Sequence, residues 1–214
     1  MYRLHYHPSN ASFTPHVLLR EVGAPFELLL VDREQGAHKR PDYLKLNPNG
    51  TIPVLEDGPL VLYETAAIAL HLADRHPAAQ LAPPLQTAAR AHFYKWMVWL
   101  TNTLQPRLMH CFYPDRLVED QTAAAQVKRR AEADVLALLQ QLDDQLAAHP
   151  GPWLLGTDHS AADPFAFMLC RWTRNFSGRK ARDFTHIAPW LQRMLQRPAV
   201  QAAFEAEVTV APYF

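Results

Sequence analysis

The beginning of the chain alternates short apolar runs with one amphipathic segment. Residues 2–6 alternate apolar and polar side chains, which predicts a strand with one buried face. A helix is expected to begin at Thr14-Pro15, as a hydroxyl cap followed by proline in the first helical position, and to end at Gly23. Residues 26–31 form a second apolar run. Strand, helix and strand at this spacing imply a right-handed crossover and a parallel pair.

The following segment predicts a hairpin and a second helix. Residues 33–50 are polar and loop-like, with one helical turn near Asp42. The short apolar runs 52–55 and 60–63 flank the turn sequence Glu-Asp-Gly-Pro, which is a hairpin signal. Residues 64–75 have helical apolar spacing. The expected order is therefore strand, helix, strand, loop, two strands and helix.

The character of the chain changes at residues 78–87, which are rich in Ala, Pro and Gln and predict a linker. Helical patterns occupy the rest of the chain, over residues 90–110, 123–149, 163–174, 189–195 and 198–206. The third of these is apolar nearly all round, so we expect a buried central helix. The pattern predicts an α/β domain over residues 1–77, a linker over 78–87 and an all-helical domain over 88–214.

Composition narrows the class of protein. A chain of 214 residues with 49% hydrophobic and 20% charged residues is long and apolar enough to form packed domains rather than disorder. Basic and acidic residues balance at 21 each without a basic run, so no nucleic-acid partner is expected. No apolar stretch reaches membrane-span length, and the N-terminus is strand-like rather than a signal peptide. Cys111 and Cys170 lie in apolar helical sequence, typical of buried thiols in a reducing compartment, so we expect a cytoplasmic location.

Four segments of the first domain could carry binding chemistry. Ile52-Pro53 opens a strand, and a cis bond there would turn the Ile52 N–H and C=O outward, toward an extended peptide. The alternative, an ordinary trans proline at a strand edge, is favoured from this segment alone. Glu64-Thr65 stands at the mouth of a helix, where free N–H groups favour a carboxylate and the acid can accept from an ammonium group. The alternative there is a capping pair without a ligand.

The first turn, Pro8 to Ser12, places two hydroxyls and an amide near a second helix start. A hydroxyl there could donate to a thiolate, although capping and turn formation explain the same residues. The basic cluster His38-Lys39-Arg40 could hold a carboxylate, or could be an ordinary solvated loop.

Two further patterns have simpler explanations. Ser160-Ala-Ala-Asp163 is a variant of the capping box and predicts a structural role. The eleven histidines are scattered without zinc-like spacing, so we expect no metal.

Three motifs together resemble a known family. They are Asn47-Pro-Asn-Gly-Thr-Ile-Pro-Val-Leu55, Leu62-Tyr-Glu-Thr-Ala-Ala-Ile68 with His71-Leu-Ala-Asp74, and Ser160-Ala-Ala-Asp163. Each is moderately specific, whereas all three in this order, with a proline-rich linker between the second and the third, are highly specific. The chain resembles a bacterial glutathione transferase over its whole length.

The resemblance implies a thioredoxin-like first domain that binds glutathione, followed by a helical bundle. It implies a cis peptide before Pro53 and main-chain pairing of Ile52 with the cysteinyl part of glutathione. Glu64 and Thr65 would hold the γ-glutamyl end. The basic cluster, through His38 and Lys39, stands where several classes bind the glycyl carboxylate.

The chain departs from the bacterial beta class at the thiol-activating position. That class carries a cysteine where this chain has Ala11, so a mixed disulfide at that position is not available. Ser9 falls near the serine of the theta- and zeta-like classes, and Asn10 and Ser12 are rivals for the catalytic role. Where the beta class places a histidine from its first long helix, this chain has Gln105.

The function expected from the resemblance is that of a glutathione transferase active in detoxification. Glutathione, bound as the thiolate, would attack a hydrophobic electrophile or reduce a peroxide or disulfide, with glutathione as co-substrate and no metal. A hydrophobic pocket would be lined by Trp99, Gln105, Tyr113 and Trp172. Surplus apolar surface on the first two helices after the linker predicts a homodimer. The alternative is a non-catalytic protein that binds glutathione or another ligand and has kept the fold.

Overall fold

The computed structural model describes residues 1–214, which divide into two compact units. The first unit contains residues 1–82 and 195–211, and the second contains residues 83–194 and 212–214. The sequence-based boundaries at residues 77 and 88 stay a prediction. Residues 195–211 return to the first unit, although they are far from it in the sequence.

The first unit is built on a four-stranded sheet in the order β2-β1-β3-β4. The strands are β1 (Tyr2–Tyr6), β2 (Phe26–Leu30), β3 (Val54–Asp57) and β4 (Leu60–Tyr63). β1 and β2 are parallel, which confirms the expected parallel pair, and β3 is antiparallel to both of its neighbours. The predicted hairpin is the β3–β4 pair.

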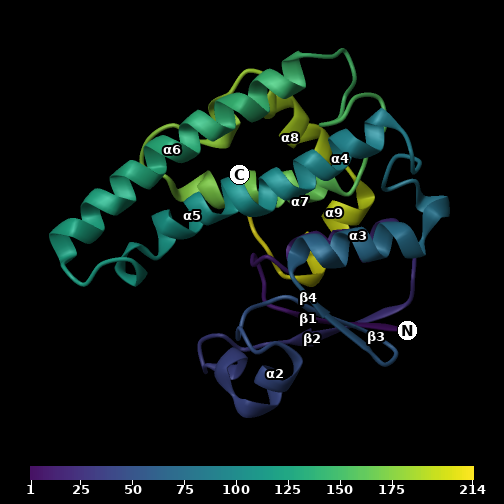
Figure 1. Cartoon of the computed structure of the whole chain (residues 1–214), viewed down its shortest axis with the longest axis horizontal. Helices are drawn as coiled ribbons and strands as arrows, with labels where there is room; N and C mark the ends of the chain where they lie inside the picture. The colour runs from purple at the N-terminus through teal and green to yellow at the C-terminus, as the bar shows by residue number, and fades with distance from the viewer. The chain divides into compact units, whose positions relative to one another are not determined.

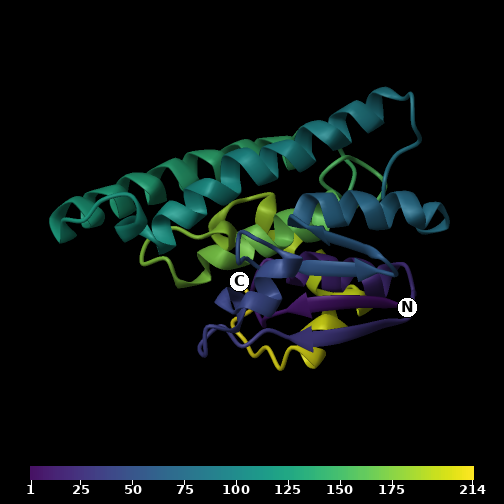
Figure 2. The same cartoon turned by 60° about the horizontal axis from the view of Figure 1, so that its bottom comes forward.

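The helical elements of this unit are α1 (Phe13–Glu21), η1 (Ala37–Lys39), α2 (Pro41–Leu46), α3 (Thr65–Arg75), η2 (Pro77–Ala79) and α9 (Pro198–Ala206). Figure 2 shows α2 beside the end of the sheet toward which β1 runs. Helix α1 begins at Phe13 with Ser12 as its N-cap. The expected start, with Thr14 as the cap and Pro15 in the first helical position, is therefore wrong by two residues. The Phe13 N–H already bonds to the Asn10 carbonyl, which starts the turn earlier. Gly23 ends the helix with φ 65°, as predicted.

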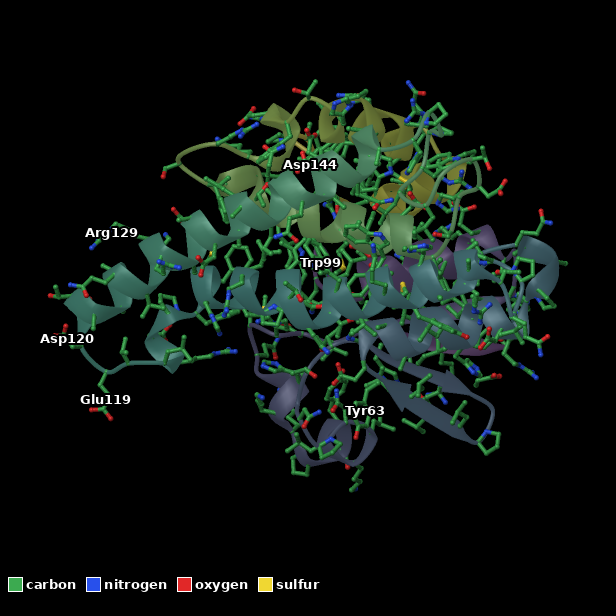
Figure 3. The ribbon with its side chains drawn as sticks, turned by 45° about the horizontal axis from the view of Figure 1, so that its top comes forward. Tyr63, Trp99, Glu119, Asp120, Arg129 and Asp144 are labelled. Carbon is green, nitrogen blue, oxygen red and sulfur yellow. The ribbon has the colours of Figure 1, made fainter.

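The second unit is helical. Its elements are α4 (Ala88–Trp99), the π-helical segment η3 (Leu100–Leu104), α5 (Gln105–Phe112), η4 (Pro114–Arg116), α6 (Gln121–Ala147), α7 (Ala162–Arg171), η5 (Trp172–Asn175), η6 (Ala181–Asp183) and most of α8 (Ile187–Leu195). Helices α5 and α6 lie side by side (Figure 1), and Figure 3 labels Arg129 and Asp144 on α6. No helix combines the length and the apolar character that a membrane crossing needs.

Three expectations for this unit have clear outcomes. Every residue of α7 is buried, which confirms the central apolar helix. The single helix expected over residues 90–110 is interrupted by the π-helical segment. Pro106 follows at the second position of α5 and has no N–H to donate to the preceding turn, which accounts for the altered hydrogen bonding there. Both cysteines are free and buried, as expected.

The acid of the capping-box motif before α7 bonds back as predicted, whereas the N-cap of the helix is Ala161 rather than the expected Ser160. Asp163 is fully buried and accepts a hydrogen bond from the Ser160 N–H at 2.9 Å, as the motif predicts. Its carboxylate also accepts from the Leu154 N–H at 2.8 Å and from the Trp190 indole N–H at 3.1 Å. Burial raises the pKa of this carboxyl, while the hydrogen bonds oppose that shift. One side chain thus joins a loop and two helices within the second unit.

Asp163→Ala should lower the free energy of unfolding by about 3 kcal/mol or more, because it leaves several buried donors without an acceptor. Urea denaturation followed by circular dichroism measures the loss. Asp158→Ala is the matched control, since Asp158 is exposed in the same loop and accepts only from Thr157. Equal stability of the two variants would contradict the structural role of Asp163.

Candidate active site

The predicted binding segments lie together at one edge of the sheet in the first unit, the edge that is formed by strand ends. β1 and β4 end at this edge and β3 begins there, with Val54 paired to His5 on one side and to Tyr63 on the other. Figure 3 labels Tyr63 at the end of β4. Continuing both registers places Ile52 level with the turn after β1 on one side and with Thr65 on the other. Three segments that are distant in the sequence therefore converge.

The turn after β1 has a defined backbone shape. The Asn10 N–H donates to the His7 carbonyl at 3.2 Å, with Pro8 and Ser9 at the two central positions. Ser9 has φ 58°, so the turn has the type II pattern of proline followed by a residue in the left-handed region. The Ser9 N–H donates to Glu207 Oε2 at 2.9 Å. The Ser9 hydroxyl has no partner within the protein and remains available to a ligand.

Asn10 and Ser12 have different hydrogen-bonding environments. Asn10 Oδ1 accepts from the Ala11 N–H at 2.6 Å, which leaves the Asn10 amide N–H groups without a partner. The Ser12 hydroxyl is fully buried, donates to the His7 carbonyl at 3.1 Å and accepts from the His7 N–H at 3.2 Å. Ser12 therefore fastens the start of α1 to the end of β1, whereas Ser9 and Asn10 keep free donors.

The N-terminal ends of α1 and α3 meet next to this turn. The Thr65 hydroxyl, in the first turn of α3, donates to the Ala11 carbonyl at 3.4 Å. Glu64 directly precedes α3, is exposed and has φ 74°, a left-handed backbone that is uncommon outside glycine and clusters at functional sites. The first turn of α3 leaves backbone N–H groups without an intrahelical partner, and both helix starts present the positive ends of their dipoles, an arrangement that favours anions.

The chain that leads into β3 is held by two side chains that the sequence reasoning did not single out. Asn47 is fully buried, and its amide donates to the Thr51 carbonyl at 2.8 Å and to the Thr51 hydroxyl at 3.0 Å. The Tyr43 hydroxyl donates to the same carbonyl at 2.8 Å. These bonds fix the backbone immediately before Ile52. The Ile52–Pro53 peptide bond is cis, as the resemblance implied.

The basic cluster lies over the same loop. Lys39 Nζ donates to the Asn49 carbonyl at 3.3 Å. A Cβ atom at Gly50 would lie 2.8 Å from Lys39 Nζ and 2.9 Å from the His38 carbonyl, so η1 packs directly against this glycine, whose φ is 57°. The structure thus places His38 and Lys39 beside the loop that delivers Ile52.

A buried acid also reaches the turn after β1. Glu207, at the end of α9, contacts Ser9 and lies 2.9 Å from His16 Nδ1 in α1. The sequence reasoning gave no role to either Glu207 or His16. No local pattern signals this contact, because the pair is separated by 191 positions.

The expected pocket residues lie in the second unit. Tyr113 follows α5 and Trp172 begins η5, and both rings pack against Phe112, with centroid distances of 6.5 Å and 6.2 Å respectively. Trp172 is largely buried, whereas Phe112 is 40% exposed. The structure therefore brings Tyr113 and Trp172 into one aromatic cluster.

The other two pocket candidates lie on the same helical run but outside that cluster. Trp99 ends α4 (Figure 3), and its ring packs against Trp96 with centroids 4.9 Å apart. Gln105 is the first residue of α5, directly after the π-helical segment, and is partly buried. No group of three or more His, Cys, Asp or Glu side chains is arranged to hold a metal ion.

Comparison with known proteins gives consistent matches along the chain. The model of the glutathione S-transferase N-terminal domain matches residues 2–74, and that of the C-terminal domain matches residues 107–198. Glutathione S-transferase GstA of Escherichia coli O157:H7 is 32% identical over 209 residues, which cover 96% of this chain and 98% of the relative. Glutathione S-transferase GST-4.5 of Xanthomonas campestris is 30% identical over 205 residues, with the same coverage of 96% and 98%.

A solved structure gives the same result for the fold. A glutathione transferase homolog from Sulfitobacter, with bound glutathione, superimposes with a TM-score of 0.88 at 26% identity and covers 96% of this chain and 98% of its own. The expected fold, a thioredoxin-like N-terminal domain followed by a helical domain, is confirmed. The chain belongs to the glutathione S-transferase family.

Proposed function

We propose that this protein is a glutathione transferase that binds glutathione at the edge of the sheet in the first unit. The observation that carries the proposal is the meeting of two helix N-termini beside the start of β3, joined by the bond from Thr65 to the Ala11 carbonyl. Glutathione is an extended tripeptide with two carboxylates, an ammonium group and a thiol. The edge offers donors for anions, one exposed acid and an unpaired strand start, which together match those groups.

Each part of glutathione has a matching group on this edge. The γ-glutamyl carboxylate fits the N-terminus of α3, where the Thr65 hydroxyl donates to it in exchange for its long 3.4 Å bond to the Ala11 carbonyl. The ammonium group fits the carboxylate of Glu64. The cysteinyl main chain pairs with Ile52, which precedes the first paired residue of β3. His38 and Lys39 bind the glycyl carboxylate. This arrangement leaves the thiol at the turn after β1.

The thiol is activated at that turn by Ser9, with Asn10 as the nearest rival. Both side chains have free donors, whereas the Ser12 hydroxyl already bonds to His7. A hydrogen bond to the sulfur and the positive end of α1 both stabilise the thiolate and lower the thiol pKa. The thiolate then forms a bond to an electrophilic carbon while the leaving group departs with its electron pair. With a peroxide or a disulfide, the thiolate attacks one oxygen or sulfur and the O–O or S–S bond breaks. A second glutathione then attacks the oxidised sulfur, which completes the reduction and releases glutathione disulfide.

The second substrate is a hydrophobic electrophile, and its pocket includes Trp99, Gln105, Tyr113 and Trp172. Aromatic side chains with a few polar groups are typical of such pockets. This chemistry fits a role in detoxification, and the two free buried thiols are compatible with the reducing cytoplasm. The named relatives favour catalysis over the alternative of a binding protein without activity.

Replacing both Glu64 and Thr65 with Ala should weaken glutathione binding by about 2–4 kcal/mol, because charge-assisted hydrogen bonds each contribute about 1.5–3 kcal/mol and are not additive. Isothermal titration calorimetry gives the affinity. Glu27→Ala is the control, since this exposed acid on β2 pairs with Arg3 at the opposite end of β1. Unchanged affinity in the folded double variant would rule out this part of the site.

The thiol of bound glutathione should have a lower pKa than free glutathione, and Ser9→Ala should raise the bound value by roughly 1–2 units. The reason is the loss of one hydrogen bond to a charged group, worth about 1.5–3 kcal/mol at 1.36 kcal/mol per unit. Thiolate absorbance during a pH titration measures both values. Alanine keeps a side chain at this left-handed position, so the backbone is not loosened as it would be by glycine.

Asn10→Ala and Ser12→Ala complete the comparison. A shift in either variant, with none in Ser9→Ala, would move the activating role away from Ser9. An unshifted thiol pKa in the wild-type complex would instead support a binding protein without catalytic function.

We also propose that the protein is a homodimer with an isologous interface that includes α4. Tyr94 and Val98 are 41% and 57% exposed and lie four residues apart, so they share one face of that helix. Val98→Glu should therefore yield monomers in light scattering at micromolar concentration, because a charge would be buried at the contact. Arg129→Glu on α6 is a matched change of an exposed residue. A monomeric wild-type protein would exclude the dimer.

A further inference from the structure

Helix α9 is fastened to α1 at both ends. Arg197, just before α9, forms two bonds of 2.6 and 2.7 Å to Glu21 at the end of α1. Between the ends, Phe13 and Phe204 stack with centroids 4.8 Å apart. After α9, Glu207 bonds to the beginning of the α1 region. The two helices are therefore antiparallel, and only the second fastening touches the turn that carries Ser9.

The Glu207 carboxylate uses both of its oxygens. Its side chain is completely buried, and so is that of His16. Oε1 lies 2.9 Å from His16 Nδ1, and Oε2 accepts from the Ser9 N–H at 2.9 Å. Arg20 Nε donates to His16 Nε2 at 3.0 Å, so this ring nitrogen is the acceptor and the imidazole proton lies on Nδ1. The bonds form one directed chain from Arg20 through His16 to Glu207, which also holds the backbone of Ser9.

The contact with Ser9 matters because Ser9 has an unfavourable backbone. Its φ of 58° is a region that glycine adopts readily and serine does not. A hydrogen bond from the Ser9 N–H to a buried charged carboxylate is of the strong class and stabilises this conformation. The backbone conformation in turn sets the direction of the Ser9 hydroxyl.

The negative charge of Glu207 acts on the thiol pKa in the opposite direction to its positioning of Ser9. Burial and the charge of Glu207 both raise the pKa of Tyr6, at the end of β1, so the charge is felt at this end of the sheet. Arg20 faces the charges of both Glu205 and Glu207. A negative charge alone would disfavour a nearby thiolate and raise the thiol pKa. Positioning and bare charge therefore predict opposite results when Glu207 is neutralised.

We infer that Glu207 is a positioning residue for thiol activation: through the Ser9 N–H it keeps the Ser9 hydroxyl directed at the sulfur of glutathione. The inference rests on the proposed function. It assigns a role in the first turn of the chain to a residue that follows the last helix.

Glu207→Gln is the informative variant, and Glu21→Gln is its matched control. The amide keeps one acceptor but turns the other into a donor, so it cannot accept from both Ser9 and His16. We expect the thiol pKa of bound glutathione to rise by roughly one unit, which lowers the thiolate fraction and kcat near neutral pH about tenfold. KM for glutathione should stay the same, and kcat should recover at high pH. Glu21→Gln also breaks a link between α1 and α9, and should lower stability without changing the thiol pKa.

Hydrogen exchange of the Ser9 amide gives a readout that does not need glutathione. Exchange should be faster in Glu207→Gln than in the wild type and unchanged in Glu21→Gln. An unchanged or lowered thiol pKa in Glu207→Gln would overturn the inference, since a lowered value shows that Glu207 acts only as a nearby charge. A thiol pKa raised equally in both variants would also overturn it, because loss of the α1–α9 link alone would then explain the effect.

If Glu207→Gln does not fold, Arg20→Gln is a second variant that tests the role of Glu207. Arg20 is only partly buried, so its replacement is expected to disturb folding less. Without its donor, the His16 ring loses the bond that fixes its orientation, so Glu207 is held less firmly toward the Ser9 N–H, and the bound thiol pKa should again rise. A wild-type value in this variant would overturn the inference. If the wild-type protein does not lower the thiol pKa at all, both this role and the proposed function fail. A lowered wild-type value that Glu207→Gln leaves unchanged contradicts only the role of Glu207.

Discussion

The pairing of β3 with two neighbours is the constraint on which the proposed binding edge depends. Because β3 runs antiparallel to both β1 and β4, its beginning lies where those two strands end. The turn of Ser9 follows β1 and the start of α3 follows β4. Strand pairing alone therefore places these two segments next to each other. The bond from Thr65 to the Ala11 carbonyl then joins them. Sheet topology thus brings two helix starts, whose positive dipole ends favour anions, to the same place.

Local patterns were sufficient to predict most of the elements and several of the candidate residues. Alternation predicted β1, the turn sequence predicted the β3–β4 hairpin, and uniform apolar character predicted the buried α7. These signals are short-range, since each depends on residues within one element. The start of α1 was misplaced for the same reason. The Thr14-Pro15 pattern is local, whereas the helix begins where the chain leaves β1, at a point fixed by the bonds between Ser12 and His7.

Features that depend on contacts across the chain were beyond such patterns. Asn47 was noticed only as part of a motif, and its buried bonds to Thr51 explain physically why an asparagine serves there. Glu207 lies in a short stretch of mixed polar and apolar residues, which is typical of the end of any helix. Its importance comes from burial against His16 and Ser9, which only the folded chain brings together. A buried carboxylate needs hydrogen-bond donors around it, and the sequence alone does not reveal which residues supply them.

The return of α9 to the first unit has a consequence for how the protein is made. When residues 1–82 have emerged from the ribosome, all four strands of the sheet are available, but α9, which packs on α1, has not yet been synthesised. During the synthesis of the second unit, Phe13 lacks Phe204 and the turn of Ser9 lacks its carboxylate. The first unit to be translated is therefore the last to be completed, and its apolar surface on α1 stays uncovered until residues 195–211 emerge.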